Sequence, residues 1–165
     1  MAEILCFSRN RRTSVEQIDE QTMKSSCRLQ DSLMEALVEI IVKLPDLEIT
    51  GIDGKINRSF RPHEINIHER LQKVIGTRIG PGIKKIIKGF MGKTEGEREL
   101  AFMVEECCEG VILSFTKEVL LTAPKDRLME REFFGQMVRD NPRLYNSCAA
   151  LAHDSPLMEG VDPPK

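Results

Sequence analysis

The amino-acid sequence predicts an all-α protein, a compact bundle of five to seven helices with either a small β-hairpin or an extended loop at residues 46–61. Three observations lead to this fold class. No Gly or Pro interrupts residues 15–44, apolar side chains recur at helical spacing in several segments, and helix-capping residues precede the strongest of them.

The first expected helix covers at least residues 31–44. Ser14 and Gln17 have the spacing of a capping box, in which the two side chains satisfy backbone N–H groups reciprocally. Pro45 is expected to end the helix. Its apolar positions follow the helical repeat: Leu33, Leu37, Ile40, Ile41 and Leu44.

The middle of the chain is expected to hold two shorter helices. Residues 46–61 alternate and contain turn residues, which favours the hairpin or loop. Pro62 can open a helix that runs to Ile75 and stops at Gly76. A Gly-Pro-Gly turn at 80–82 then precedes a short helix with Ile83, Ile86, Ile87 and Phe90 turned inward.

The second half is expected to contain the core helix and two helices after it. Thr94 and Glu97 form another capping box before the longest apolar stripe, which extends from Leu100 to Val119. A further helix follows Pro124 and ends before Pro142, and a last short helix reaches Leu151.

Length and composition indicate one domain with short appendages. The chain has 165 residues, a formal net charge of −2 and a mean hydropathy of −0.28, which exclude an integral membrane protein and a wholly disordered chain. We expect a basic N-terminal arm at 1–12, a single helical domain at 13–153, and a flexible tail or truncated linker at 154–165.

No pattern in the sequence predicts an enzyme, a metal site or a cofactor. The five cysteines show no CxxC spacing, and we expect reduced, mostly buried thiols. His63 and His68 are five residues apart, so on a helix they point to different sides. The segment from Gly89 to Thr94 lacks the first glycine of a phosphate-binding loop. We therefore assign no catalytic residue, no metal ligand and no cofactor.

The most informative feature is the segregation of charge. Residues 70–93 contain no Asp or Glu, and residues 95–118 hold seven glutamates. The expected membrane- or polyanion-binding residues are Arg70, Lys73, Arg78, Lys84, Lys85, Lys88 and Lys93. The expected oligomer-facing acidic residues are Glu95, Glu97, Glu99, Glu105, Glu106 and Glu109.

This segregation has a functional and a structural interpretation. A basic patch can bind acidic phospholipid, since each basic residue near an anionic bilayer contributes about 1 kcal/mol. A positive face and a negative face on one chain can also dock head to tail into a homo-oligomer or polymer. The alternative is a solvated basic helix whose charge is compensated by the acidic segment that follows.

Residues 90–142 resemble part of the helical N-terminal domain of influenza-type (orthomyxovirus) matrix proteins. The resemblance rests on Phe90 to Lys93, Ile112 to Lys117, Leu121 to Pro124, and Arg127, Arg131 and Phe133. It implies an all-α structural protein that binds acidic membranes, self-associates beneath a viral envelope, and contacts ribonucleoprotein or RNA. The localisation it implies is the virion, the host cytoplasm and inner membrane faces, and the nucleus.

Two other functions stay open from the sequence. Residues 71–87 resemble a helix-hairpin-helix, in which a glycine-rich turn presents backbone N–H groups to a nucleic-acid phosphate, although Pro81 removes one donor. The third possibility is a helical adaptor whose partner is another protein and whose basic face is merely solvated.

Overall fold

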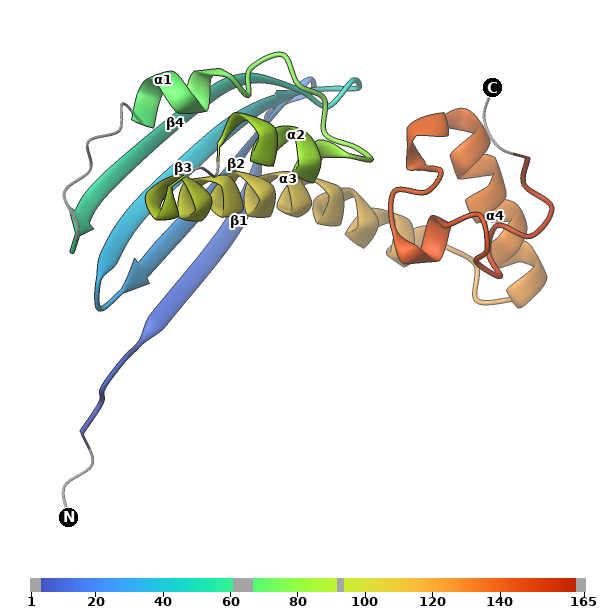
Figure 1. Cartoon of the computed structure of the whole chain (residues 1–165). Helices are drawn as coiled ribbons and strands as arrows, with labels where there is room; N and C mark the ends of the chain where they lie inside the picture. The colour runs from blue at the N-terminus through green and yellow to red at the C-terminus, as the bar shows by residue number, and fades with distance from the viewer. Residues whose placement is uncertain (1–3, 61–66, 92–93, 163–165) are drawn as a thin grey trace. The chain divides into compact units, whose positions relative to one another are not determined.

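The computed structural model describes residues 4–60, 67–91 and 94–162, and it corrects the expected fold class. The first part of the chain forms a four-stranded antiparallel sheet, and helices follow it (Figure 1). The protein therefore contains both α and β structure, and the all-α prediction is wrong. The 13–153 region is accordingly not a helical domain throughout.

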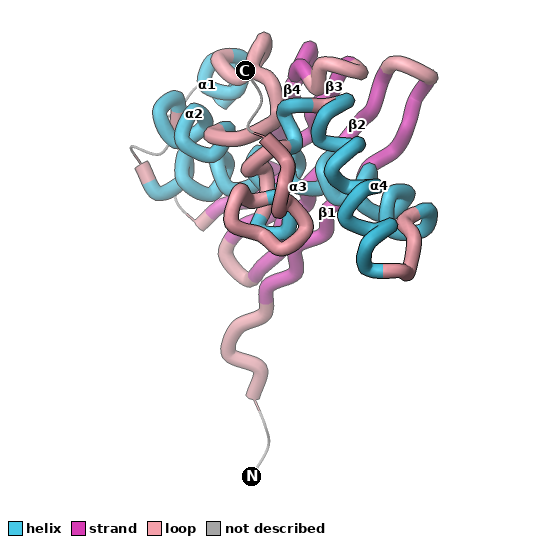
Figure 2. The backbone as a smooth tube through the Cα atoms, turned by 90° about the vertical axis from the view of Figure 1, so that its right-hand side faces the viewer, coloured by secondary structure: helices cyan, strands magenta, loops and turns pink. Residues whose placement is uncertain are grey.

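The sheet is a simple meander with strand order β1-β2-β3-β4. Its strands are β1 (Arg9–Asp19), β2 (Thr22–Asp31), β3 (Met34–Lys43) and β4 (Glu48–Ser59). The expected hairpin or loop at 46–61 is largely one long strand. β1 begins inside the expected basic arm, and Figure 2 shows the extended segment before it projecting from the sheet.

The helix expected at 31–44 is instead the end of β2 followed by β3. Burial in β3 alternates with a period of two, because every second residue from Met34 to Val42 is buried and the residues between are more exposed. The segment from Val38 to Val42 is rich in β-branched residues, whose stiff side chains suit a pleated surface better than a helix. Ser14 and Gln17, expected to cap a helix, lie within β1.

The expected helices at 83–90, after Thr94 and after Pro124 are confirmed. The helix expected from Pro62 to Ile75 already ends at Gln72, and its expected start at Pro62 lies outside the described residues. The structure contains α1 (Ile67–Gln72), α2 (Ile83–Phe90), α3 (Glu95–Thr122) and α4 (Arg127–Asp140). The capping box is present at the start of α3. The Thr94 backbone N–H donates to Glu97 Oε2 at 3.1 Å, and the Glu97 N–H donates to Thr94 Oγ1 at 3.2 Å.

Two compact units divide the chain, residues 1–114 and residues 115–165. In the first unit, α1, α2 and the beginning of α3 cover one face of the sheet (Figure 1). The close packing of α3 is visible at Ser25 on β2, whose hydroxyl donates to the Cys107 carbonyl at 2.9 Å in a buried contact. No helix from the described residues of this unit covers the opposite face of the sheet.

The second unit has its own small core. Phe134, Val138, Leu151 and Met158 are buried together, and Val161 packs against them. The expected flexible tail at 154–165 is therefore packed over its described part, because Met158 is only 2% exposed. Two short 3₁₀ turns, Pro142–Leu144 and Ala149–Leu151, replace the last short helix of the prediction.

Candidate functional site: the basic surface of α2

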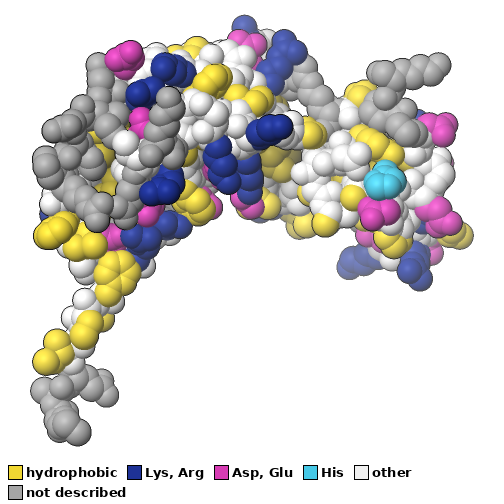
Figure 3. All heavy atoms as spheres, viewed as in Figure 1, with side chains coloured by type: hydrophobic (Ala, Val, Ile, Leu, Met, Phe, Trp, Pro, Cys, Tyr) yellow, Lys and Arg dark blue, Asp and Glu magenta, His cyan; other side chains and the backbone are white. Residues whose placement is uncertain are grey.

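The helix α2 carries the densest group of the predicted cations. Ile83 and Ile87 are buried and attach the helix to the core, while Lys84, Lys85 and Lys88 are exposed. The chain enters α2 through Gly82, whose φ of +87° is a left-handed conformation that suits glycine. Figure 3 shows Lys and Arg side chains gathered over α1 and α2 on this face of the first unit.

The three lysines do not point the same way. Lys84 and Lys88 are one turn apart and lie on the side that meets α3. Lys84 Nζ is 3.5 Å from Glu109 Oε2, and Lys88 Nζ is 4.0 Å from Glu105 Oε1. Lys85 lies about 100° further around the helix, away from the buried isoleucines, and has no ion pair within the described residues.

Lys88 also has a structural role. Glu105 is buried, and its Oε1 atom has no hydrogen-bond partner among the described residues. A buried carboxylate without a hydrogen bond is costly unless a cation lies near it. The Lys88 ammonium provides that cation while the lysine side chain itself stays 70% exposed.

Two apolar side chains lie on the other flank of α2. Ile86 is 42% exposed and Phe90 is 37% exposed, although both were expected to turn inward. They are one turn apart, so they share a side of the helix. Lys85 lies elsewhere on the exposed circumference, about 100° from Ile86 and about 140° from Phe90. The outer surface of α2 therefore presents two half-exposed hydrophobic groups and Lys85, which has no ion pair within the described residues. We call Lys85, Ile86 and Phe90 the outer α2 face.

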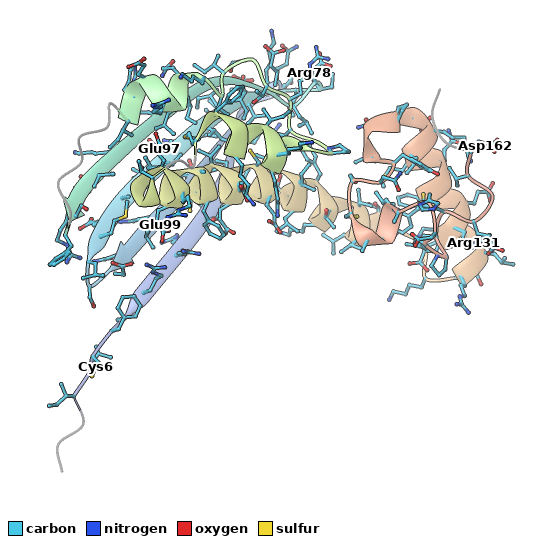
Figure 4. The ribbon with its side chains drawn as sticks, in the orientation of Figure 1. Cys6, Arg78, Glu97, Glu99, Arg131 and Asp162 are labelled. Atoms are coloured by element: carbon cyan, nitrogen blue, oxygen red, sulfur yellow. The ribbon has the colours of Figure 1, made fainter. Side chains whose placement is uncertain are left out.

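The remaining predicted basic residues are spread over neighbouring elements. Arg70 of α1 pairs with the buried Glu97 at 3.3 Å, and Arg78 lies 3.9 Å from Glu48 (Figure 4). Lys73 is exposed, without an ion pair in the described part of the chain. Lys93 lies outside the described residues.

The structure turns most of the predicted acidic surface toward the protein itself. Glu97 is buried against Arg70, and Glu99 pairs with Arg9 and Arg11 of β1 at 3.6 and 3.3 Å. Figure 4 places Glu97 and Glu99 on the first turns of α3. Glu105 and Glu109 face α2, Glu106 is half-buried, and the side chain of Glu95 is not described.

The segment that resembles a helix-hairpin-helix follows a different path from a compact hairpin. Ten residues, 73–82, separate α1 from α2. Part of this connection runs along β4, since Gly76 N–H donates to the Ile49 carbonyl at 2.8 Å and Ile79 N–H donates to the Leu47 carbonyl at 2.9 Å. The N–H groups of Gly76 and Ile79 are therefore occupied, and nucleic-acid binding by the turn at residues 80–82 stays a prediction.

Three of the five cysteines are buried, as expected. Cys27, Cys107 and Cys108 are buried, while Cys6 and Cys148 are exposed. Burial raises the pKa of Cys108 to about 12, and the nearby Glu105 adds to the increase. Such a thiol is a poor nucleophile. Among the residues that the structure describes, no group of His, Cys, Asp and Glu side chains could hold a metal ion, and no helix has the length and apolar character to cross a bilayer.

Comparisons with family models, curated proteins and solved structures yield no match for this chain. The orthomyxovirus-type resemblance implied an all-α domain, and that implication is wrong. Nothing in the comparisons supports a viral matrix function, so we do not propose one.

Proposed function

We propose that this chain is a non-enzymatic protein that binds acidic membrane surfaces peripherally through the outer α2 face. The observation that carries the proposal is that one short helix, anchored by the buried Ile83 and Ile87, exposes both a cation, Lys85, and two apolar side chains, Ile86 and Phe90. Cations attract the helix to anionic headgroups, and half-exposed apolar groups then enter the interfacial region.

The surrounding charge supports the same surface. Lys84 is 61% exposed and Lys88 is 70% exposed, so their weak ion pairs with α3 leave both ammonium groups open to solvent. Residues 70–93 have no acidic side chain that would repel an anionic headgroup. The apolar flank favours a lipid surface over the phosphate backbone of a duplex, because a phosphate backbone makes no apolar contact with Ile86 or Phe90.

Co-sedimentation with phosphatidylserine vesicles across a salt series tests this function, with phosphatidylcholine vesicles as the lipid control. We expect binding to the acidic vesicles at low salt and its loss as salt increases. Lys85→Glu removes an attraction of about 1 kcal/mol and adds a repulsion of similar size, so we expect about a thirtyfold weaker affinity. Lys43→Glu, the same charge change at the end of β3, is the matched control and should bind like the wild type.

The apolar contribution needs its own variant. Phe90→Ser should weaken binding to acidic vesicles by a factor that changes little with salt, because it removes a hydrophobic contact. Lys88 is unsuitable for substitution, since its loss would leave the buried Glu105 carboxylate without a cation. The proposal is wrong if the wild type does not bind acidic vesicles at low salt, or if Lys85→Glu binds them as tightly as the wild type.

A further inference from the structure

The two edges of the sheet differ in how they are covered. The outer edge of β4 is covered at its beginning. Residues 76–79 form backbone hydrogen bonds there with Leu47 and Ile49, and the Gln72 side chain of α1 donates to the Ile52 carbonyl at 3.2 Å. The outer edge of β1 has no backbone partner within the described residues. An edge strand of 11 residues with free N–H and C=O groups is a template for another strand.

We infer that β1 pairs antiparallel with β1 of a second copy of this chain, so that the two four-stranded sheets join into one. This inference concerns a different surface from the outer α2 face and does not depend on membrane binding. The occupant of the edge follows from the charges that β1 carries on its two faces.

The arginines of β1 divide between these faces. Arg9 and Arg11 point to the helical side. Arg9 pairs there with the buried Asp31 at 2.8 Å, and the Arg11 guanidinium lies 4.2 Å from the centre of the Phe102 ring. Both arginines thus interact with groups of their own subunit, and their side chains do not face a partner strand.

Arg12 points to the opposite, open face and has no such partner among the residues that the structure describes. It lies directly opposite Arg28 of β2, a like-charge arrangement that destabilises a sheet. Arg28 itself pairs with Glu35 at 2.9 Å, and no ion pair to Arg12 is present among the described residues. The side of Arg12 that faces away from β2 is therefore a place for an acidic group.

The second copy supplies this group in one particular register. If Ser14 lies on the two-fold axis, Arg12 of each copy is directly opposite Glu16 of the other, and both side chains are on the open face. On the helical face the same register brings Thr13 opposite Val15, a favourable β-branched pair. The regular ladder runs from Arg11 to Gln17, because β1 has a register irregularity between Gln17 and Asp19.

Other registers can also place the helices of both copies on the same side of the joined sheet. They form less favourable side-chain pairs across the interface than the Ser14 register does. A two-fold at Arg12 would place the two arginines face to face, and a two-fold at Thr13 would place Arg12 opposite Ser14. A two-fold at Val15 would place Arg12 opposite Ile18. The Ser14 register is the one among these that forms two Arg–Glu pairs, and it joins backbone groups that all point outward from β1.

A charge swap on the full chain tests the register. Sedimentation equilibrium should show a concentration-dependent dimer for the wild type. Arg12→Glu and Glu16→Arg each create two like-charge pairs, so each should raise the dimer dissociation constant at least about tenfold. The double variant restores opposite charges and should recover most of the affinity. Lys55→Glu, on the same open face but on β4, is the matched control and should not change the dimer.

A symmetric cross-link gives an independent readout that does not depend on charge. In a background with Cys6→Ser and Cys148→Ser, Ser14→Cys should form an intermolecular disulfide with its own copy under mild oxidation. Directly opposite residues of an antiparallel pair are close enough for this bond. Lys55→Cys in the same background should remain monomeric on a non-reducing gel.

Each outcome decides the inference. A wild type that is monomeric at every concentration overturns it, as does a dimer that is unaffected by Arg12→Glu. A dimer that is lost in both single variants and not recovered in the double variant overturns the register. Failure of this inference can be distinguished from failure of the proposed function. Lys85→Glu leaves β1 unchanged, so its vesicle binding tests the proposed function alone. Arg12→Glu is measured without vesicles, so it tests strand pairing alone.

Discussion

Gly110 of α3 lies so close to Thr13 of β1 that a Cβ atom on the glycine would be 2.9 Å from the threonine Cγ2. The distance from that added Cβ atom to Val15 Cγ2 would be 3.2 Å. Both neighbours are branched at Cβ and have little rotamer freedom to withdraw. The missing side chain of Gly110 therefore allows the long helix to approach the edge strand closely.

Gly110→Ala should destabilise the protein although alanine is the better helix former. The added methyl group has to push α3 away from β1, and overpacking of this kind costs about 1 to 3 kcal/mol, more than the roughly 1 kcal/mol gained in helix propensity. Urea unfolding monitored by circular dichroism measures the free energy of unfolding. Gly89→Ala in α2 is the matched control, because a Cβ there meets nothing within 4 Å. It should stabilise slightly, and a stabilising Gly110→Ala would contradict the packing.

Asp31 should make the protein sensitive to acid. Burial of this carboxyl raises its pKa, but hydrogen bonds from the Leu33 and Met34 N–H groups, at 2.7 and 2.6 Å, and from Arg9 lower it by more. The net shift is downward, so the stabilisation is complete above the ordinary pKa of an aspartate and is lost as the pH falls through the lower folded-state value.

Asp31→Asn removes the charge that these donors share, and we expect a loss of about 2 kcal/mol in the free energy of unfolding at neutral pH. The difference between variant and wild type should shrink below pH 4, roughly the ordinary pKa of an aspartate. Asp53→Asn on the exposed β4 surface is the control. Equal effects of the two substitutions at neutral pH would show that the turn between β2 and β3 does not depend on the Asp31 carboxylate.

The cysteines should divide into two reactivity classes. Cys6 and Cys148 are exposed, while Cys27, Cys107 and Cys108 are buried and the pKa of each buried thiol is raised by that burial. A thiol-specific chromogenic reagent at neutral pH should therefore modify two cysteines quickly and the other three only after denaturation. Fast reaction of a third thiol in the native protein would mean that the sheet and α3 separate more readily than their packing indicates.

The sequence is informative about helices and much less so about strands. The capping pattern of Thr94 and Glu97 predicts the start of α3 correctly, because both groups act within a few residues of each other. Ser14 and Gln17 have the same spacing but lie in a strand, since cross-strand pairing with β2 outweighs a local cap. In β3 the apolar residues fit both periods, and only packing against α3 selects the alternation.

The sequence predicts the location of the candidate site but not the contacts of its side chains. Segregation of charge between 70–93 and 95–118 is visible in the sequence and leads to α2. The sequence does not reveal that Lys84 and Lys88 lean toward Glu109 and Glu105, because those contacts depend on how α2 packs on α3. The sequence also gives no sign that Arg12 faces Arg28, because that pairing depends on the register of β1 and β2, two strands that the sequence analysis did not predict.

Phe134 should hold the second unit together without affecting the sheet. Its ring packs edge to face on Phe133 with centroids 5.4 Å apart, and it is buried in the cluster with Val138, Leu151 and Met158. Phe134→Ala should cost this unit about 3 to 5 kcal/mol, enough to open a core of this size. Leu128→Ala is the control, because Leu128 is 75% exposed on the same helix.

Amide hydrogen exchange read by mass spectrometry locates the effect. In Phe134→Ala we expect loss of protection in peptides from residues 127–161 and unchanged protection in β2 and β3, since the two units have separate cores. In Leu128→Ala both regions should exchange as in the wild type. Loss of protection in β2 and β3 alongside residues 127–161 would mean that the two units unfold as one cooperative structure.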